Sequence, residues 1–464
     1  MKKDISRLLY ACLALMGLLS SCGEDRSGEY YALIATKTWI YEVMQENYLF
    51  YEDIPAEEKL NFFKKPAEFL ASAASSKDQK NGYVFSHVDS VLTRATSTYP
   101  CFGFEAVLVR TDGGSNALRV LYTEPDSPAE EAGLKRGDWI IAIDNKKIST
   151  SDYTTYINRP TKAYNFTLAN YNPYPEEVDD PEFNYVEFDT LGTIQMPSPR
   201  YVEEQDILKT GTISAGNRKA FYILYNEFSE NTDVLKELFS QLNGQTFDDI
   251  ILDLRYNPGG YVSTSQLMGT ALAPASAMGQ PFLQMTYNDK INKTEVLNFD
   301  ASLLPGSTTL SYQNLYILTS GNTASASEII INCLRPYMEG RLYQVGMPTF
   351  GKNVAQQLFT NEEAPNIELW LTTTYLSNSQ GFYEYYTNGL QPDFEVEENY
   401  AEKLGELGSE EDQLMQPVLY RMAYGNFPSS GNSEENMSRH ISTHPRVQVL
   451  YNSISQKPHA NLLK

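Results

Sequence analysis

Residues 315–338 read LYILTSGNTASASEIIINCLRPYM and contain three patterns in direct succession. Residues 315–318 form a short apolar run typical of a buried strand, Gly321 marks a turn, and residues 325–338 carry the apolar spacing of a helix. A buried strand that runs through a short turn into a helix is the building unit of α/β folds. The segment therefore predicts an α/β core around it.

The same alternation continues on both sides of this segment, through residues 205–400. Apolar runs predict strands at residues 221–225, 250–254 and 367–375, and periodic segments predict helices at residues 232–242 and 264–272. The chain has 464 residues, which is enough for about two to four domains. The expected fold class is therefore a multidomain α/β protein with its largest domain at residues 205–400.

A second marker lies upstream, at residues 127–144, which read SPAEEAGLKRGDWIIAID. Ser127 and Pro128 predict the start of a short helix that Gly133 ends, and Gly137 turns the chain into an apolar strand. The arrangement closely resembles a PDZ domain, which we expect over residues 88–172.

The resemblance also gives a role to CFGF, residues 101–104, which stands where PDZ domains carry their carboxylate-binding loop. Backbone N–H groups of such a loop, together with a sheet edge, capture the end of a peptide. The resemblance thus implies that Phe102, Gly103 and Phe104 bind peptide. The alternative is a PDZ fold that serves as a docking or gating scaffold.

The N-terminus has the form of a targeting segment. Basic residues precede an apolar run at residues 8–19 that is too short to span a bilayer. LSSC, residues 19–22, resembles a bacterial lipobox, which implies a signal peptide over residues 1–21 and a lipid anchor on Cys22. Ordinary secretory cleavage is the alternative. We therefore expect a cell-envelope lipoprotein at the outer membrane, facing the periplasm or the surface.

The remaining segments complete the expected domain organisation. Residues 22–33 are predicted to form a tether, and the helical periodicity after them predicts a small N-terminal domain. A net charge of −23 argues against nucleic acid and anionic lipid as partners. The expected segments are the helical domain at 34–87, a connector at 173–204 and a C-terminal extension at 401–464.

Ser325 stands at the corner where the predicted strand meets the predicted helix. A hydroxyl there lies beside helix N–H groups, which suits a nucleophile whose tetrahedral intermediate needs anion stabilisation. Ser325 and Glu328 also form a capping box ahead of an apolar run, and this alone would explain Ser325 as a helix N-cap. The pattern leaves both interpretations open.

Two other turns have a chemical and a structural interpretation. In DLRYNPGG, residues 253–260, the amides of a Pro-Gly-Gly turn can hold an oxyanion, although an ordinary β-turn explains the same residues. GMPTFGKN, residues 346–353, is close to a phosphate-binding loop, but Asn353 follows Lys352 where that loop needs Ser or Thr. We therefore do not expect nucleotide binding at Lys352.

Four motifs occur in order: DLRYNPGG at 253–260, TASASE at 323–328, PTFGKNVAQQ at 348–357 and NGLQPD at 388–393. With the PDZ-like segment ahead of them, they resemble the C-terminal processing, or tail-specific, peptidases of serine peptidase family 41. The resemblance covers residues 36–400. It implies an α/β Ser–Lys protease core of the ClpP/crotonase-like kind, without cofactor or metal.

The resemblance also implies the site residues. Ser325 matches the nucleophile, Lys352 the general base and Gln356 the residue that positions the lysine. The backbone amides of Gly260 and Ala326 match the oxyanion donors. The implied partner is a protein or peptide substrate.

Physical chemistry agrees with a Ser–Lys site. A serine hydroxyl needs a base to take its proton, and a lysine is a base only when neutral. Burial among apolar neighbours such as Phe350 and Val354 would lower the pKa of Lys352. A Ser-His-Asp triad is not expected, because no histidine lies within the motif-bearing core: the chain has His87, His440, His444 and His459.

The sequence thus predicts an envelope serine endopeptidase that cleaves unfolded or C-terminally exposed protein segments. One alternative is a peptide-binding lipoprotein with a PDZ domain and no catalytic activity. A structural surface lipoprotein is a further alternative, although it leaves the motifs unexplained. Cys101 and Cys333, in different predicted domains, are expected to be buried free thiols.

Overall fold

A computed structural model describes residues 27–90, 99–151, 153, 156–157, 159–173, 185–429, 447–457 and 461–463. The predicted signal peptide and Cys22 lie outside the described residues. Within the described part of the chain, no helix combines the length and the apolar character needed to span a membrane.

The N-terminal domain is helical as predicted, but it is also joined to the core by strand pairing. Its first helix begins at Ser27, inside the segment predicted to be a tether. Strand β3 pairs antiparallel with β19 of the core, and the Leu49 N–H donates to the Thr372 carbonyl oxygen at 2.9 Å. The domain consists of α2 (Ser27–Asn47), α3 (Pro66–Ala73), β1 (Gln79–Lys80), β2 (Tyr83–Val84) and β3 (His87–Ser90).

The PDZ-like domain is a seven-stranded sheet with the predicted short helix α4 (Pro128–Glu131). The Ser127 hydroxyl accepts a hydrogen bond from the Glu130 N–H at 3.2 Å and caps this helix as expected. In spatial order the strands are β21 (Gln448–Asn452), β4 (Phe104–Arg110), β5 (Asn116–Thr123), β6 (Trp139–Ile143), β8 (Asn165–Tyr171) and β9 (Phe188–Gln195), with β7 (Lys146–Lys147) against β6.

Two strands of this sheet come from outside residues 88–172. Strand β9 lies in the predicted connector, and β21 lies in the predicted C-terminal extension. The domain is therefore larger than predicted, and both neighbouring segments belong to it.

The core contains a six-stranded sheet that is parallel except for the β10–β11 pair. The helices predicted around residues 232–242, 264–272 and 325–338 are all present. The sheet order is β10 (Ile207–Ala215), β11 (Arg218–Tyr225), β12 (Asp249–Asp253), β16 (Asn314–Thr319), β17 (Leu342–Gly346) and β20 (Phe394–Glu395).

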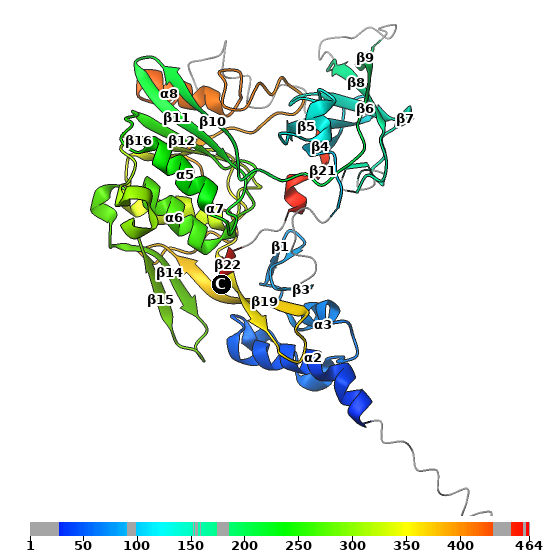
Figure 1. Ribbon diagram of the computed structural model, residues 1–464, viewed down its shortest axis with the longest axis vertical. Helices are drawn as coiled ribbons and strands as arrows, with labels where there is room; N and C mark the ends of the chain where they lie inside the picture. Colours follow the sequence, from blue (N-terminus) through cyan, green and yellow to red (C-terminus); the bar gives the residue numbers. More distant parts are fainter. Residues whose placement is uncertain are drawn as a thin grey trace, which may run out of the picture.

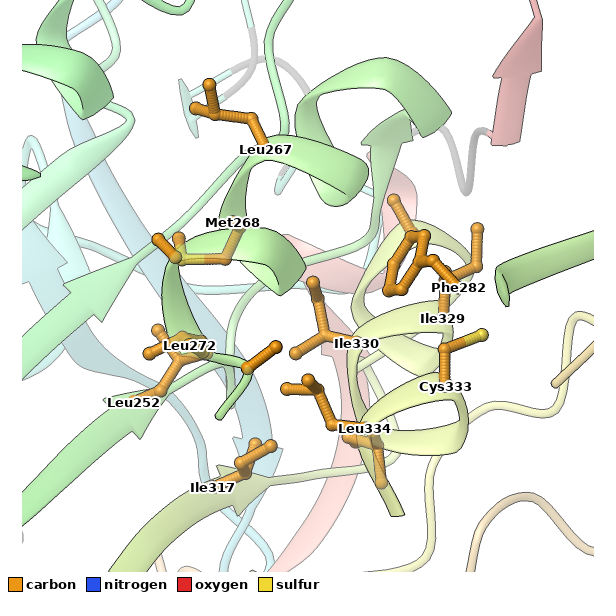
Figure 2. Packing of buried hydrophobic residues seen from close by; sticks show 14 of the residues in the cluster. Leu252, Leu267, Met268, Leu272, Phe282, Ile317, Ile329, Ile330, Cys333 and Leu334 are labelled. Carbon is orange, nitrogen blue, oxygen red and sulfur yellow. The ribbon is translucent and has the colours of Figure 1, made fainter. Parts of the chain in front are cut away.

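Successive residues of each central strand point to opposite faces of this sheet, and both faces are covered. One face packs against α5 (Asp233–Leu242), α6 (Val262–Leu272) and α7 (Ala326–Leu334), where Leu252 and Ile317 meet Leu272, Ile330 and Leu334 (Figure 2). The other face packs against α8 (Met415–Tyr424) and the PDZ-like domain.

A second core sheet lies beside the first and places the candidate site residues that follow α7. Its strand order is β13-β22-β18-β19-β14-β15, with β3 paired to β19. Figure 1 shows β14, β15, β19 and β22 of this sheet below the first sheet. The strands are β13 (Gly260–Tyr261), β22 (Asn461–Leu463), β18 (Val354–Thr360), β19 (Ile367–Ser377), β14 (Pro281–Tyr287) and β15 (Thr294–Asn298).

A buried ion-pair network ties the C-terminal extension and the PDZ-like domain to the core. The Arg255 guanidinium donates two hydrogen bonds of 2.8 Å to the Asp412 carboxylate and also pairs with Asp253. Glu398 accepts from Arg255 and from Arg136 of the PDZ-like domain. Removing one partner of such a network would leave a buried charge unpaired, so a substitution here is expected to be strongly destabilising.

The two cysteines of the described region are free thiols, as predicted. Cys333 is fully buried in the core cluster, whereas Cys101 is only partly buried.

Candidate active site

Ser325 lies at the sharp corner between β16 and α7, and its geometry is not that of an ordinary helix cap. Its backbone has φ 64° and ψ −119°, a region that non-glycine residues rarely adopt. An N-cap serine has extended φ and ψ and accepts a hydrogen bond at its hydroxyl. The Ser325 Oγ is buried and has no hydrogen-bond partner among the described residues. The geometry therefore favours the reactive interpretation over the capping one.

Glu328 holds this corner against the segment that carries Lys352. Its fully buried carboxylate accepts from the N–H groups of Ser325 at 2.7 Å, Lys352 at 2.8 Å and Gly351 at 2.6 Å, and from the Thr349 hydroxyl at 2.6 Å. Ser325 and Lys352 donate to the same oxygen, Oε2, so their backbone nitrogens lie close together. The capping-box pattern accounts for the bond from the Ser325 N–H, but not for the bonds from Thr349, Gly351 and Lys352.

Burial sets the charge states here. The pKa of Glu328 is raised because its carboxylate is removed from water, although four donors stabilise the charged form. The pKa of Lys352 is lowered to about 7, chiefly by burial and against the opposing charges of Asp78 and Glu328. A lysine with such a pKa is neutral in a large fraction of molecules at neutral pH, which a general base requires.

Lys352 lies two residues before a strand, which argues against a phosphate-binding loop. The chain after it forms β18, whereas that loop leads into a helix. The Lys352 Nζ donates to the Gln356 Oε1 at 2.6 Å and lies 4.9 Å from the centre of the Phe85 ring. Phe350 and Val354 are buried nearby, as predicted, while Phe85 of the N-terminal domain was not foreseen.

A chain of buried hydrogen bonds continues from Gln356 into the N-terminal domain. The Gln356 Nε2 donates to the Thr372 Oγ1 at 3.0 Å, and that hydroxyl donates to Asp78 at 2.6 Å. The Tyr48 hydroxyl donates to the other oxygen of Asp78 at 3.0 Å. Because each group has its partner, this chain fixes the Gln356 amide so that its oxygen faces Lys352. Sequence analysis did not identify Asp78, because it lies 274 positions from Lys352 and outside the four motifs.

We expect Asp78→Asn to move the low-pH limb of the pH–rate curve to lower pH. The Asp78 carboxylate favours protonated Lys352, so an amide should lower the pKa of Lys352 further. The measurement is kcat/KM of peptide hydrolysis against pH, with the exposed Glu58→Gln as control. If kcat/KM were lower at every pH while the pH of the limb stayed the same, the role of Asp78 would be purely structural.

The Pro-Gly-Gly turn of residues 258–260 packs directly against the Ser325 corner. Gly260 has φ 138°, and a Cβ there would lie 2.1 Å from the Phe228 carbonyl oxygen, so only glycine fits. The Asn257 carbonyl oxygen accepts from the Ala324 N–H and the Ser327 hydroxyl, both at 3.2 Å. The turn is therefore fixed to the loop that carries the serine.

The two predicted oxyanion donors lie on either side of this contact. Gly260 belongs to the turn, and Ala326 is the first residue of α7, where N–H groups lack intrahelical acceptors. Their role in binding an oxyanion stays a prediction.

The predicted peptide-binding loop of the PDZ-like domain is mostly buried. The Phe102 side chain is fully buried, Phe104 is nearly so, and Gly103 has φ 72° beside Ser127. The Cys101 N–H already donates to the Arg200 carbonyl oxygen at 2.8 Å. The carboxylate-binding role of Phe102, Gly103 and Phe104 stays a prediction.

Of the four histidines, His87 lies within the described residues. It stacks on Trp370 and its Nε2 lies 3.4 Å from the Asp89 carboxylate. These contacts give His87 a structural role in the β3–β19 pair.

Fold and site together define the class: a multidomain α/β protein with a PDZ-like domain and a core in which the backbone N–H groups of buried Ser325 and Lys352 share one carboxylate oxygen. Family models match three successive parts of the chain. These are the peptidase S41 N-terminal domain over residues 35–87, a PDZ domain over residues 119–160 and peptidase family S41 over residues 219–396. The chain belongs to peptidase family S41.

Similar proteins agree with this assignment. The chain is 30% identical over 311 residues to a carboxyl-terminal-processing protease of Picosynechococcus sp., covering 66% of each chain. It is 28% identical over 292 residues to a carboxy-terminal-processing protease of Bartonella bacilliformis, covering 62% of this chain and 60% of the relative. It therefore spans less than two thirds of the length of these curated relatives.

A solved structure covers more of the chain. The crystal structure of a protein assigned to the S41 proteases from Bacteroides fragilis is 29% identical and has a TM-score of 0.71. The match covers 83% of this chain and 97% of that structure. The similarity thus extends over the N-terminal domain, the PDZ-like domain and the core together.

Proposed function

We propose that this protein is a serine endopeptidase in which Ser325 is the nucleophile and neutral Lys352 is the general base. The observation that carries the proposal is the buried Lys352, with its lowered pKa, held beside the strained corner of Ser325 through the shared Glu328 carboxylate. Peptidase names among the relatives support it.

The geometry suggests the following sequence of steps. Lys352 takes the proton of the Ser325 hydroxyl, and Oγ attacks the carbonyl carbon of a substrate peptide bond. The N–H groups of Gly260 and Ala326 stabilise the negative charge on the carbonyl oxygen. Lys352 then gives the proton to the leaving amine, and a water molecule hydrolyses the acyl group by the reverse route.

The proposed substrates are extended segments of unfolded or C-terminally exposed proteins, because an extended chain can pair with a sheet edge near the site. The test is incubation of the purified protein with unfolded casein at neutral pH, with mass spectrometry of the products. New N-termini inside casein are expected. A folded protein that yields none would instead favour a peptide-binding protein without catalytic activity.

We further propose that Cys22 carries a lipid anchor and holds the protein at the cell envelope. The support is the sequence LSSC after a short apolar run. Cys22→Ala should release the protein from membranes, whereas Cys12→Ala, inside the apolar run, should not. The measurement is fractionation after a high-salt wash, and a Cys22→Ala protein that remains in the membrane fraction would refute the anchor.

A further inference from the structure

Strand β22 fills a strand-wide slot between two elements of the candidate active site. It pairs in parallel with β13, where Asn461 lies opposite Gly260, and with β18, where Leu462 lies opposite Gln356. Without β22, the edges of β13 and β18 on this side would be unpaired. Unpaired backbone groups at a sheet edge are a template for an extended chain.

The same C-terminal segment also pairs with the edge of the PDZ-like sheet. Strand β21 lies antiparallel to β4, and the Tyr451 ring lies 3.9 Å, centre to centre, from the ring of Tyr153. The Ala106 N–H donates to the Ser453 hydroxyl at 3.0 Å, and the Ser453 N–H donates to the Ala106 carbonyl oxygen at 3.1 Å. This edge of the domain therefore holds an extended segment of the chain itself.

Between the two strands, the segment passes the loop that leads to Ser325. The Ser455 hydroxyl donates to the Asn322 side-chain oxygen at 2.7 Å. The Lys457 ammonium pairs with Glu105 at 3.1 Å and with Glu204 at 2.6 Å. In Figure 1, β21 lies at the PDZ-like domain and β22 lies at the core.

The charge of this segment is opposite to that of the rest of the chain. Residues 447–464 contain no Asp or Glu, whereas the whole chain carries a net charge of −23. A segment without acidic residues is attracted to an acidic surface, as the two contacts of Lys457 illustrate.

In this structure, which includes the segment, the proposed nucleophile and base are inaccessible to solvent. Ser325 is 0% exposed and Lys352 is 1% exposed. A nucleophile must touch the peptide bond that it attacks, so this arrangement cannot turn over a substrate without movement. An extended substrate that runs between β13 and β18 would need the space that β22 occupies.

We propose that residues 447–457 and 461–463 act as a tethered pseudosubstrate: in cis, β21 occupies the edge of β4 and β22 occupies the slot between β13 and β18, where an extended peptide would bind. The proposal rests on the peptidase function proposed above. A tethered segment acts at a high effective concentration, so modest contacts suffice to keep the path filled. A protein substrate must displace it.

The test measures binding separately from catalysis. A fluorescein-labelled peptide of residues 447–464 is titrated against Ser325→Ala protein of full length and against the same protein ending at Pro445. We expect the shorter protein to bind about tenfold more tightly or better, which corresponds to a path that the tail fills at least about nine-tenths of the time. A scrambled peptide is the control. Equal binding by the two lengths would overturn the proposal.

The shorter protein loses Ile454, which is fully buried, so its fold is checked by circular dichroism. A full-length variant, Tyr451→Asp with Leu462→Pro, weakens both strands without deletion, because proline removes a backbone donor and aspartate disfavours the buried ring contact. Tyr451→Phe with Leu462→Ile is its matched control. The first pair should bind the probe more tightly than the second, and no difference would refute the pseudosubstrate.

Peptide hydrolysis by the same full-length, shortened and doubly substituted proteins, now with Ser325 intact, tests the pseudosubstrate separately from the proposed peptidase function. Displacing the tail should raise kcat/KM for a short peptide by a factor similar to the gain in probe affinity. If no variant hydrolyses peptide while probe binding still depends on the tail, the peptidase function is refuted and the tail assignment stands.

Discussion

Replacing Ser325 by alanine is expected to reduce peptide hydrolysis by about 10⁴-fold or more, the loss typical of a missing nucleophile. The fold should remain intact. The Ser325 hydroxyl is buried without a partner among the described residues, so its removal leaves no acceptor or donor unsatisfied. Leaving such a hydroxyl buried costs about 1–3 kcal/mol, and the variant should therefore melt at the same temperature as the parent or higher.

This combination distinguishes a nucleophile from a helix cap. Loss of an N-cap hydrogen bond would lower stability by about 0.5–2 kcal/mol and leave chemistry largely intact. The measurements are kcat/KM on a fluorogenic peptide and the melting temperature, with Ser265→Ala as control. Ser265 is equally buried, but its hydroxyl bonds to Val262 inside α6. A stable Ser325→Ala protein with full activity would remove Ser325 from the mechanism.

The sequence predicts the elements whose signals are local. The apolar runs and helical periodicity around residues 315–338 place both ends of β16 and the start of α7 within one residue, since burial on both sheet faces makes the pattern strong. The predicted helix end at residue 338 lies beyond α7, which ends at Leu334 and continues as a 3-10 turn over Arg335–Tyr337. The short helix after Ser127 has an equally clear sequence signal. Ser127 caps its start, and Gly133 adopts the positive φ that ends such a helix.

What the sequence does not predict is long-range pairing. Strand β9 is mostly exposed and shows no apolar alternation, and β21 and β22 are only five and three residues long, so none has a periodic signal. For the same reason, the sequence does not predict that Asp78 and Phe85 lie near Lys352, because this depends on the long-range contacts of the N-terminal domain with β19. The pattern at Ser325 also left two interpretations open, and the backbone angles of the folded corner favour one.

Lys352→Arg is expected to reduce hydrolysis by about 10²–10⁴-fold, the range for loss of a general base. Arginine keeps a positive charge but stays protonated at any working pH, so it cannot accept the Ser325 proton. Because a permanent charge at a site with 1% exposure can unfold the protein, Lys352→Met serves as a second variant of similar length without charge. Both should be inactive while Lys352→Met remains folded. An active, folded Lys352→Met protein would exclude Lys352 as the base.

The pH dependence of the parent tests the same assignment without substitution. Burial lowers the pKa of Lys352 to about 7, so the neutral fraction rises as the pH increases through 7 and levels off above it. Log kcat/KM should therefore climb with a slope of about one below pH 7, and activity at pH 5 should be about a hundredfold below the plateau. A free lysine would place this limb near about 10.4.

A rise in activity near neutral pH could also come from a histidine, whose free pKa is about 6.5. Titration of Lys352 must therefore be distinguished from titration of a histidine. Replacing all four histidines by glutamine removes that source: His87, His440, His444 and His459. If Lys352 is the base, this variant should keep both the limb and the plateau, since the contacts of His87 with Trp370, Asp89 and the Phe85 carbonyl oxygen are structural. Loss of the limb in a folded four-histidine variant would assign the proton to histidine, and the Ser–Lys mechanism would fall with it.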